Sequence, residues 1–198
     1  MSDIVKLDSV ENVRGTIKIE QIGVDKAYKI LAGIRGAASK AVHSALMRTH
    51  TSGKSYAAQL LRERYYIKSS DFKHYTQSKS KVDEGGLTIR FRGRHIPLLS
   101  FDTKIGKDGR VSSRVKRSST QTIIEHAFVS TVGNKAKHEG VFERETSERL
   151  PIKELFGPSA PQMMSANQDI KDDVAKHIKE TFENRLDHEI SAILNGWR

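Results

Sequence analysis

The chain has 198 residues, a net charge of +10 and no cysteine. The absence of cysteine excludes disulfides, thiolate metal ligands and cysteine nucleophiles. No apolar run approaches the ~20 residues that a membrane span needs, and the first residues lack the basic and then apolar pattern of a signal peptide. We therefore expect a single domain over residues 1–198, made in the cytoplasm and without a membrane partner.

The positive charge is concentrated in the middle third of the chain. Residues 54–117 carry 16 basic and 6 acidic side chains, whereas residues 1–53 have a net charge of +3 and residues 118–198 a net charge of −3. Such a block indicates a polyanionic partner or an acidic neighbouring subunit. A solvated basic face explains the charge equally well.

The N-terminal part predicts an arm followed by helices. Ile17 and Ile19 alternate with polar residues, which predicts a strand in an arm over residues 1–23. Apolar, alanine-rich positions at steps of three and four predict helices over residues 24–78: one from 24 to 49, a second capped by Thr51 or Ser52, and a short third one capped by Ser69 or Ser70. Residues 76–86 are polar and without periodicity, which predicts a loop.

The period then changes from helical to that of a strand. Leu87, Ile89 and Phe91 alternate with polar residues, and Asp108-Gly109 is a turn dipeptide between two strand-like runs. We expect an antiparallel sheet over residues 87–146 with a long basic hairpin. The fold class is therefore α+β: N-terminal helices, a central antiparallel sheet and a long C-terminal amphipathic helix.

Three of the four prolines lie between residues 150 and 161. Pro151 favours an extended residue before it, and the run from Ile152 to Gly157 predicts a short turn or one helical turn that ends at the glycine. Pro158 keeps the chain extended until Pro161 begins a helix. We predict a stiff elbow, formed by these prolines and Gly157, that fixes the angle between the sheet and the last helix.

The last helix is predicted over residues 162–196. Its apolar residues recur every four positions, and a stripe with this period drifts slowly around the helix axis. We expect this stripe to pack against another subunit. Its members are Ile170, Val174, Ile178, Phe182, Leu186, Ile190 and Leu194.

The sequence contains no motif with the spacing that catalysis or metal binding requires. The run "TSGKS" over residues 51–55 has an arginine, Arg48, where a phosphate-binding loop needs its first glycine. The eight histidines lack metal-ligand spacing, and Glu143 with Glu145 is the alternation of any solvated strand. We expect no enzymatic activity, no metal and no cofactor.

Basic residues at strand spacing are the candidate contact site. Arg90 and Arg92 would project from one face of a strand at ~6.8 Å intervals, which suits successive phosphates of a nucleic-acid backbone, with Arg94 beyond the Gly93 kink. Few aromatic residues accompany them, so contact would be through phosphate charge and without sequence preference. Pairing with acidic residues of neighbouring subunits is an equal alternative. The basic hairpin extends the set with Lys104, Lys107, Arg110, Arg114, Lys116 and Arg117.

Four segments together resemble a known family. They are "RERYYIKSSDF", "IRFRGRHIPLLSFDT", "GVFERET" and "RLPIKELFGPSAPQMM". In this order, between an alanine-rich helix and a long final helix, they are similar to the minor tail protein Z, or tail completion, family of tailed bacteriophages and prophages. The resemblance covers about residues 14 to 196.

The resemblance implies a structural virion protein, synthesised in the cytoplasm of a bacterial host, that acts at the head-proximal end of the tail, or neck. It implies a ring of identical copies, often a hexamer, that contacts the terminator, the tube or the head-tail connector and lies near the path of the double-stranded genomic DNA. A tail terminator that caps the tube is an alternative within the particle. A free-standing, non-specific nucleic-acid-binding protein is the alternative from another class.

Overall fold

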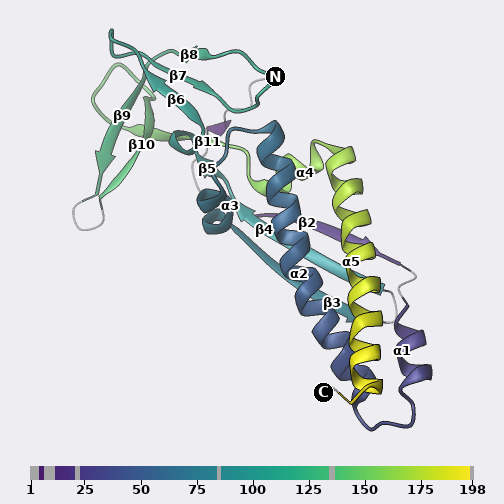
Figure 1. The fold of residues 1–198 in the computed structure, drawn as a ribbon. Helices are drawn as coiled ribbons and strands as arrows, with labels where there is room; N and C mark the ends of the chain where they lie inside the picture. The colour runs from purple at the N-terminus through teal and green to yellow at the C-terminus, as the bar shows by residue number, and fades with distance from the viewer. Residues whose placement is uncertain (1–4, 7–11, 21–22, 84–85, 134–136, 197–198) are drawn as a thin grey trace. The chain divides into compact units, whose positions relative to one another are not determined.

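The computed structural model describes residues 5–6, 12–20, 23–83, 86–133 and 137–196. Helices and antiparallel sheets make up the fold, and a long helix lies near the C-terminus, which confirms the α+β class (Figure 1). The chain divides into two compact units. The first unit comprises Met1–Arg14, Ala58–Gln77 and Arg92–Ala166, and the second comprises Gly15–Ala57, Ser78–Phe91 and Asn167–Arg198.

The second unit contains three helices, α1 (Val24–Ile30), most of α2 (Ala37–Arg64) and α5 (Gln168–Leu194). The predicted helix over residues 24–49 is interrupted, because the backbone at Gly36 takes a positive φ of 74°. The predicted break at Thr51 and Ser52 is wrong, since α2 continues through both residues. Thr51 caps no helix, and its hydroxyl instead donates to the Met47 carbonyl within α2 at 3.1 Å.

A glycine in the interior of α2 lies against α5. A Cβ atom at Gly53 would lie 2.7 Å from Cγ1 of Ile178 on α5 and 3.7 Å from Cδ1 of Ile89. The glycine therefore allows α2 and α5 to approach closely at this level. Other small residues of α2, namely Ala41, Ala45 and Ala57, are completely buried.

A three-stranded sheet has the order β2-β4-β3, formed by β2 (Asn12–Ile19), β4 (Gly86–Arg94) and β3 (Thr76–Asp83). The predicted loop over residues 76–86 is thus wrong for its first eight residues. The buried or half-buried positions of β3 include Thr76, Ser78 and Ser80. Because these inward positions are polar, the alternation that marks a strand was hidden in the sequence.

The first unit holds a five-stranded antiparallel sheet. Its order is β1 (Val5–Lys6), β11 (Ile152–Gly157), β10 (His138–Arg144) and β9 (Ala127–Val132), and β5 (Ile96–Pro97) also pairs with β11. Phe142 pairs with Glu154 and Val141 with Val129. The short 3-10 helix η1 (Leu98–Ser100) follows β5.

A second, three-stranded sheet of this unit has the order β6 (Asp102–Ile105), β7 (Val111–Arg114) and β8 (Thr122–Ile124). The turn predicted at Asp108-Gly109 joins β6 to β7, and Gly109 has the positive φ, 80°, that such a turn needs. The sheet expected over residues 87–146 is therefore distributed over three sheets. The strands β8 and β9 are separated by a turn at His126, which has a φ of 61°.

The predicted elbow over residues 150–161 is largely a strand. Residues 152–157 form β11, which pairs with three other strands, so the predicted turn or helical turn is wrong. The ring of Phe101 lies directly against Gly157 and leaves no room for a Cβ atom. Gly157 therefore serves close packing within the first unit rather than the end of a helical turn.

The predicted C-terminal helix is two helices, α4 (Ala160–Ser165) and α5. Ser159 caps α4, and Gln162 completes a capping box in which its amide oxygen accepts the Ser159 backbone N–H at 2.8 Å. Pro161 lies in the first turn, as expected. Among the helices that the structure describes, none has the length and hydropathy of a membrane-spanning segment.

Candidate nucleic-acid and partner interface

Strand β4 carries its three arginines on one side, as the sequence predicts. Ile89, Phe91 and Gly93 are buried, and the intervening Arg90, Arg92 and Arg94 are exposed. In the part of the chain that the structure describes, none of the three guanidinium groups forms an ion pair with a carboxylate. Arg90 belongs to the second unit, and the other two belong to the first.

Arg92 and Arg94 line a pocket of the first unit with a volume of about 310 Å³. The other lining residues, His74, Tyr75 and Gln77, come from the end of α3 (Ser69–Tyr75) and the start of β3. The α3 helix confirms the predicted short helix, although Lys68 precedes it without a side-chain cap. The pocket combines two arginines with other hydrogen-bonding groups, which is the chemistry of an oxyanion site.

Backbone packing brings the walls of this pocket together. A Cβ atom at Gly93 would lie 2.8 Å from Cδ of Pro161 and 3.4 Å from the Tyr75 carbonyl oxygen. The absence of a side chain at Gly93 therefore lets β4 approach Pro161 at the start of α4, and the Tyr75 carbonyl at the end of α3 lies at an ordinary contact distance. The rings of His74 and Tyr75 meet edge to face with centroids 4.7 Å apart.

The phenol of Tyr75 stays protonated at neutral pH. Burial raises its pKa above the usual value of 10.0, and the nearby carboxylates of Asp71 and Glu154 act in the same direction. The Arg94 guanidinium lowers this pKa, but it is the smallest of these influences. Tyr75 is therefore a neutral hydroxyl at the pocket wall, able to donate or accept a hydrogen bond.

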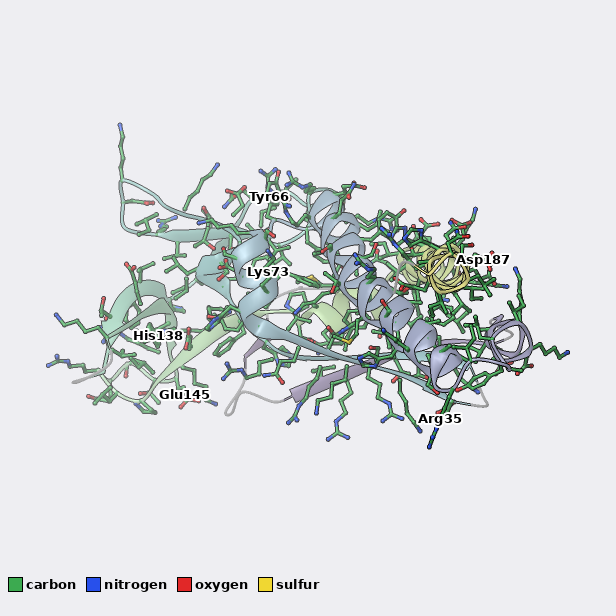
Figure 2. The ribbon with its side chains drawn as sticks, turned by 60° about the horizontal axis from the view of Figure 1, so that its bottom comes forward. Arg35, Tyr66, Lys73, His138, Glu145 and Asp187 are labelled. Atoms are coloured by element: carbon green, nitrogen blue, oxygen red, sulfur yellow. The ribbon has the colours of Figure 1, made fainter. Side chains whose placement is uncertain are left out.

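Two cations of the basic hairpin are held by the chain itself. Arg114 donates from Nε and Nη2 to Oδ2 of Asp102, at 3.1 and 2.7 Å, and its guanidinium lies 4.4 Å from the ring centroid of Tyr66. Arg117 lies 4.5 Å from the same centroid and donates from Nε to the Arg62 carbonyl at 2.8 Å. Both arginines therefore stabilise the fold around Tyr66, which is labelled in Figure 2.

The remaining predicted cations of the hairpin differ in their exposure. Nε of Arg110 is 3.3 Å from Oδ2 of Asp108, and Nζ of Lys104 is 4.0 Å from Oδ1 of Asp102. Lys107 is exposed in the turn, whereas Lys116 is half-buried and forms a β-bridge with Tyr65. The predicted set thus separates into the β4 arginines, the solvent-facing end of the hairpin and the structural residues near Tyr66.

Comparison with known families matches almost the entire chain. The family model described as prophage minor tail protein Z (GPZ) matches residues 9–196. The chain is a member of the minor tail protein Z family. No curated protein and no solved structure is significantly similar to it. Family membership makes the chain a structural component of a phage tail, and hence of the virion.

The apolar stripe of this tail protein is mostly buried in the single chain. Six of its seven side chains, Ile170 to Ile190, are between 0 and 4% exposed in the single chain, whereas Leu194 is 56% exposed. The six are thus buried within the single chain, and the predicted packing of this stripe against a neighbouring subunit stays a prediction. An apolar stripe with this period has the same sequence pattern whether the helix packs against its own core or against a partner.

Other exposed cations of the minor tail protein were not predicted as contact residues from the sequence. Lys79 and Lys81 lie at exposed positions of β3, in the stretch that was expected to be a loop, and Lys18 lies at an exposed position of β2. The spacing of two in "KSK" over residues 79–81 is the signal that could have indicated a strand. The described residues contain no cluster of His, Asp and Glu side chains arranged as a metal site.

Proposed function

We propose that this chain acts at the head-proximal end of the phage tail, where it completes the tail and makes it competent to join a DNA-filled head. The family match over residues 9–196 carries this proposal, because it covers nearly the whole chain and assigns it to the minor tail proteins. Identical copies form a ring, of which a hexamer is the expected form, and this ring contacts the terminator, tube or connector proteins of the neck.

A ring at this position surrounds the path of the genome. The exposed arginines of β4 support contact with double-stranded DNA, since they have no carboxylate partner in the described part of the chain. The low aromatic content of the chain, 7%, favours contact with phosphates over base stacking. Such contact would be independent of DNA sequence and would weaken with salt.

The experiment is the removal of the protein from a producing phage, followed by electron microscopy of the tails and of the complete particles. We expect tails of normal length that do not join heads, and a rescue by the chain supplied in trans. Gold-labelled antibody against the rescued protein should mark the head-proximal end of the tail.

Two results would contradict the proposal in different ways. Tail tubes of uncontrolled length would assign the chain to termination of the tube, and a label at the distal tip would exclude the neck altogether. Light scattering of the purified chain, combined with size-exclusion chromatography, tests the ring by its mass.

A further inference from the structure

The sheet of the second unit has one covered and one open face. Along β2 and β4, the buried positions are Ile17 and Ile19, and Leu87, Ile89 and Phe91. Because side chains alternate across a strand, the residues between them lie on the opposite face. Figure 2 shows long, nitrogen-tipped side chains along the side of this sheet that is turned away from α2.

The open face within this unit is basic on all three strands. It presents Lys18 from β2, Arg90 from the central strand β4, and Lys79 and Lys81 from β3, all of which are exposed. Neighbouring strands lie about 4.8 Å apart and successive outward residues about 6.8 Å apart. Four cations on three adjacent strands therefore form a compact two-dimensional array.

Two acidic residues moderate this array without neutralising it. Lys18 lies 3.0 Å from Glu20 and Lys81 lies 3.1 Å from Asp83, both in exposed pairs two residues apart. Exposed pairs of this kind contribute about 0–1 kcal/mol, so a phosphate can displace the carboxylate. Lys79 and Arg90 have no carboxylate partner among the described residues.

The composition of the open face favours nucleic acid over protein. Its other outward residues in this unit are polar, namely Thr16 and Thr88 together with Asp83. The centres of protein–protein interfaces are apolar and depleted in lysine, whereas protein–DNA interfaces are polar and strongly basic, and hydroxyl groups such as those of threonine contact phosphates. The face also lacks an aromatic residue among its described outward positions, so it has no platform for unstacked bases.

We propose that this face, formed by Lys18, Lys79, Lys81 and Arg90, binds the phosphate backbone of duplex DNA. The inference rests on the DNA contact proposed above, and it extends that contact from Arg90 of β4 to the lysines of the neighbouring strands β2 and β3. In the hairpin, Arg114 and Arg117 are occupied by internal partners, whereas the sheet presents its cations outward.

The test measures binding of the purified full chain to a fluorescent duplex of random sequence, by anisotropy at salt concentrations from about 50 to 200 mM. The variant K79Q/K81Q removes two adjacent cations and retains polar side chains. If both contact phosphates, the slope of log K against log salt should become less steep by about 1.8, since each contact contributes about 0.9. The matched control, K176Q/K179Q, removes two exposed lysines of α5 in the same unit, and its slope should be that of the unaltered chain.

The outcomes separate this inference from the proposed function. Equal changes of the salt slope in both variants would show that only net charge matters. An unchanged slope in K79Q/K81Q would show that DNA binds elsewhere. Either result overturns the inference. If the unaltered chain does not bind the duplex, the inference is overturned too. If K79Q/K81Q in addition fails to enter tails, the open face binds an acidic protein partner instead. The antibody label on tails is independent of these measurements, so a head-proximal label without DNA binding would refute the inference alone.

Discussion

The contact between Gly53 and Ile178 gives a prediction that runs against ordinary helix propensity. Alanine in place of glycine normally stabilises the interior of a helix by about 0.8–1.0 kcal/mol. At Gly53, however, the new Cβ atom would lie 2.7 Å from Cγ1 of Ile178 and 3.1 Å from its Cδ1. The first distance is about 0.8 Å shorter than a normal carbon–carbon contact. The isoleucine cannot turn away readily, because a β-branched side chain in a helix has one strongly preferred χ1 rotamer.

Overpacking of a well-filled core costs about 1–3 kcal/mol, which exceeds the gain from helix propensity. We therefore expect G53A to lower the free energy of unfolding by about 1 kcal/mol, and the midpoint of thermal unfolding by about 2–4 °C. Chemical denaturation followed by circular dichroism measures the first quantity, and a thermal scan measures the second. The pair S55G and S55A, at an exposed position of the same helix, calibrates the propensity difference without the contact.

A double-mutant cycle identifies the partner of the added methyl group. I178A alone should cost about 2–5 kcal/mol, as for other large-to-small changes in cores. In the I178A background, the G53A substitution should become neutral or stabilising, with a coupling of about 1–2 kcal/mol. If G53A stabilises the chain as much as the difference between S55A and S55G, α2 and α5 are not as close as described and the reasoning is refuted.

Three further predictions concern other parts of the fold. S159A should lower the unfolding free energy by about 1 kcal/mol in urea titrations through loss of the α4 cap, with S165A at the exposed end of α4 as the neutral control. Burial, aided by Lys54, lowers the pKa of His50 below 6.5 against an opposing hydrogen bond with Ser78. The stability that the neutral imidazole contributes is therefore complete above pH 6.5 and is lost as the pH falls through the folded-state pKa. H50Q should make the unfolding free energy depend less on pH in this window. An unchanged pH dependence would contradict the assignment of this effect to His50. R114M should cost about 1–3 kcal/mol through the lost hydrogen bonds to Asp102 but leave the salt slope of DNA binding unchanged; a shallower slope would make Arg114 a DNA contact.

The sequence predicts elements well where one periodicity dominates. The stripe of α5 repeats every four residues over a long segment, and the turn dipeptide Asp108-Gly109 has few alternatives. The helix that carries the stripe and the turn were therefore both predicted correctly. Prediction from the sequence fails where tertiary contacts outweigh local signals. Thr51 and Ser52 resemble a helix cap, yet α2 continues through them, and Gly53 beside them packs against Ile178 of α5. The strand β11, next to Pro151 and Pro158, is likewise stabilised by pairing with distant strands.

The same distinction applies to the candidate site. The exposed side of β4 follows from alternation alone, so Arg90, Arg92 and Arg94 could be placed in advance, although their contact with DNA stays a prediction. The pocket beside Arg94 could not be predicted, because it depends on α3 meeting β4. The enclosure of Tyr66 by two arginines was equally hidden, since it joins segments that are distant in the chain.

The burial of the α5 stripe has a consequence for the order of events in morphogenesis. Six of its seven side chains are buried within the single chain, so a second copy is not needed to cover them. We therefore expect a newly made subunit to fold before it contacts other tail proteins. Those contacts would then use side chains that are exposed in the single chain; among the described residues of the second unit, the large apolar ones are Tyr28, Ile30, Ile34, Met47 and Leu194.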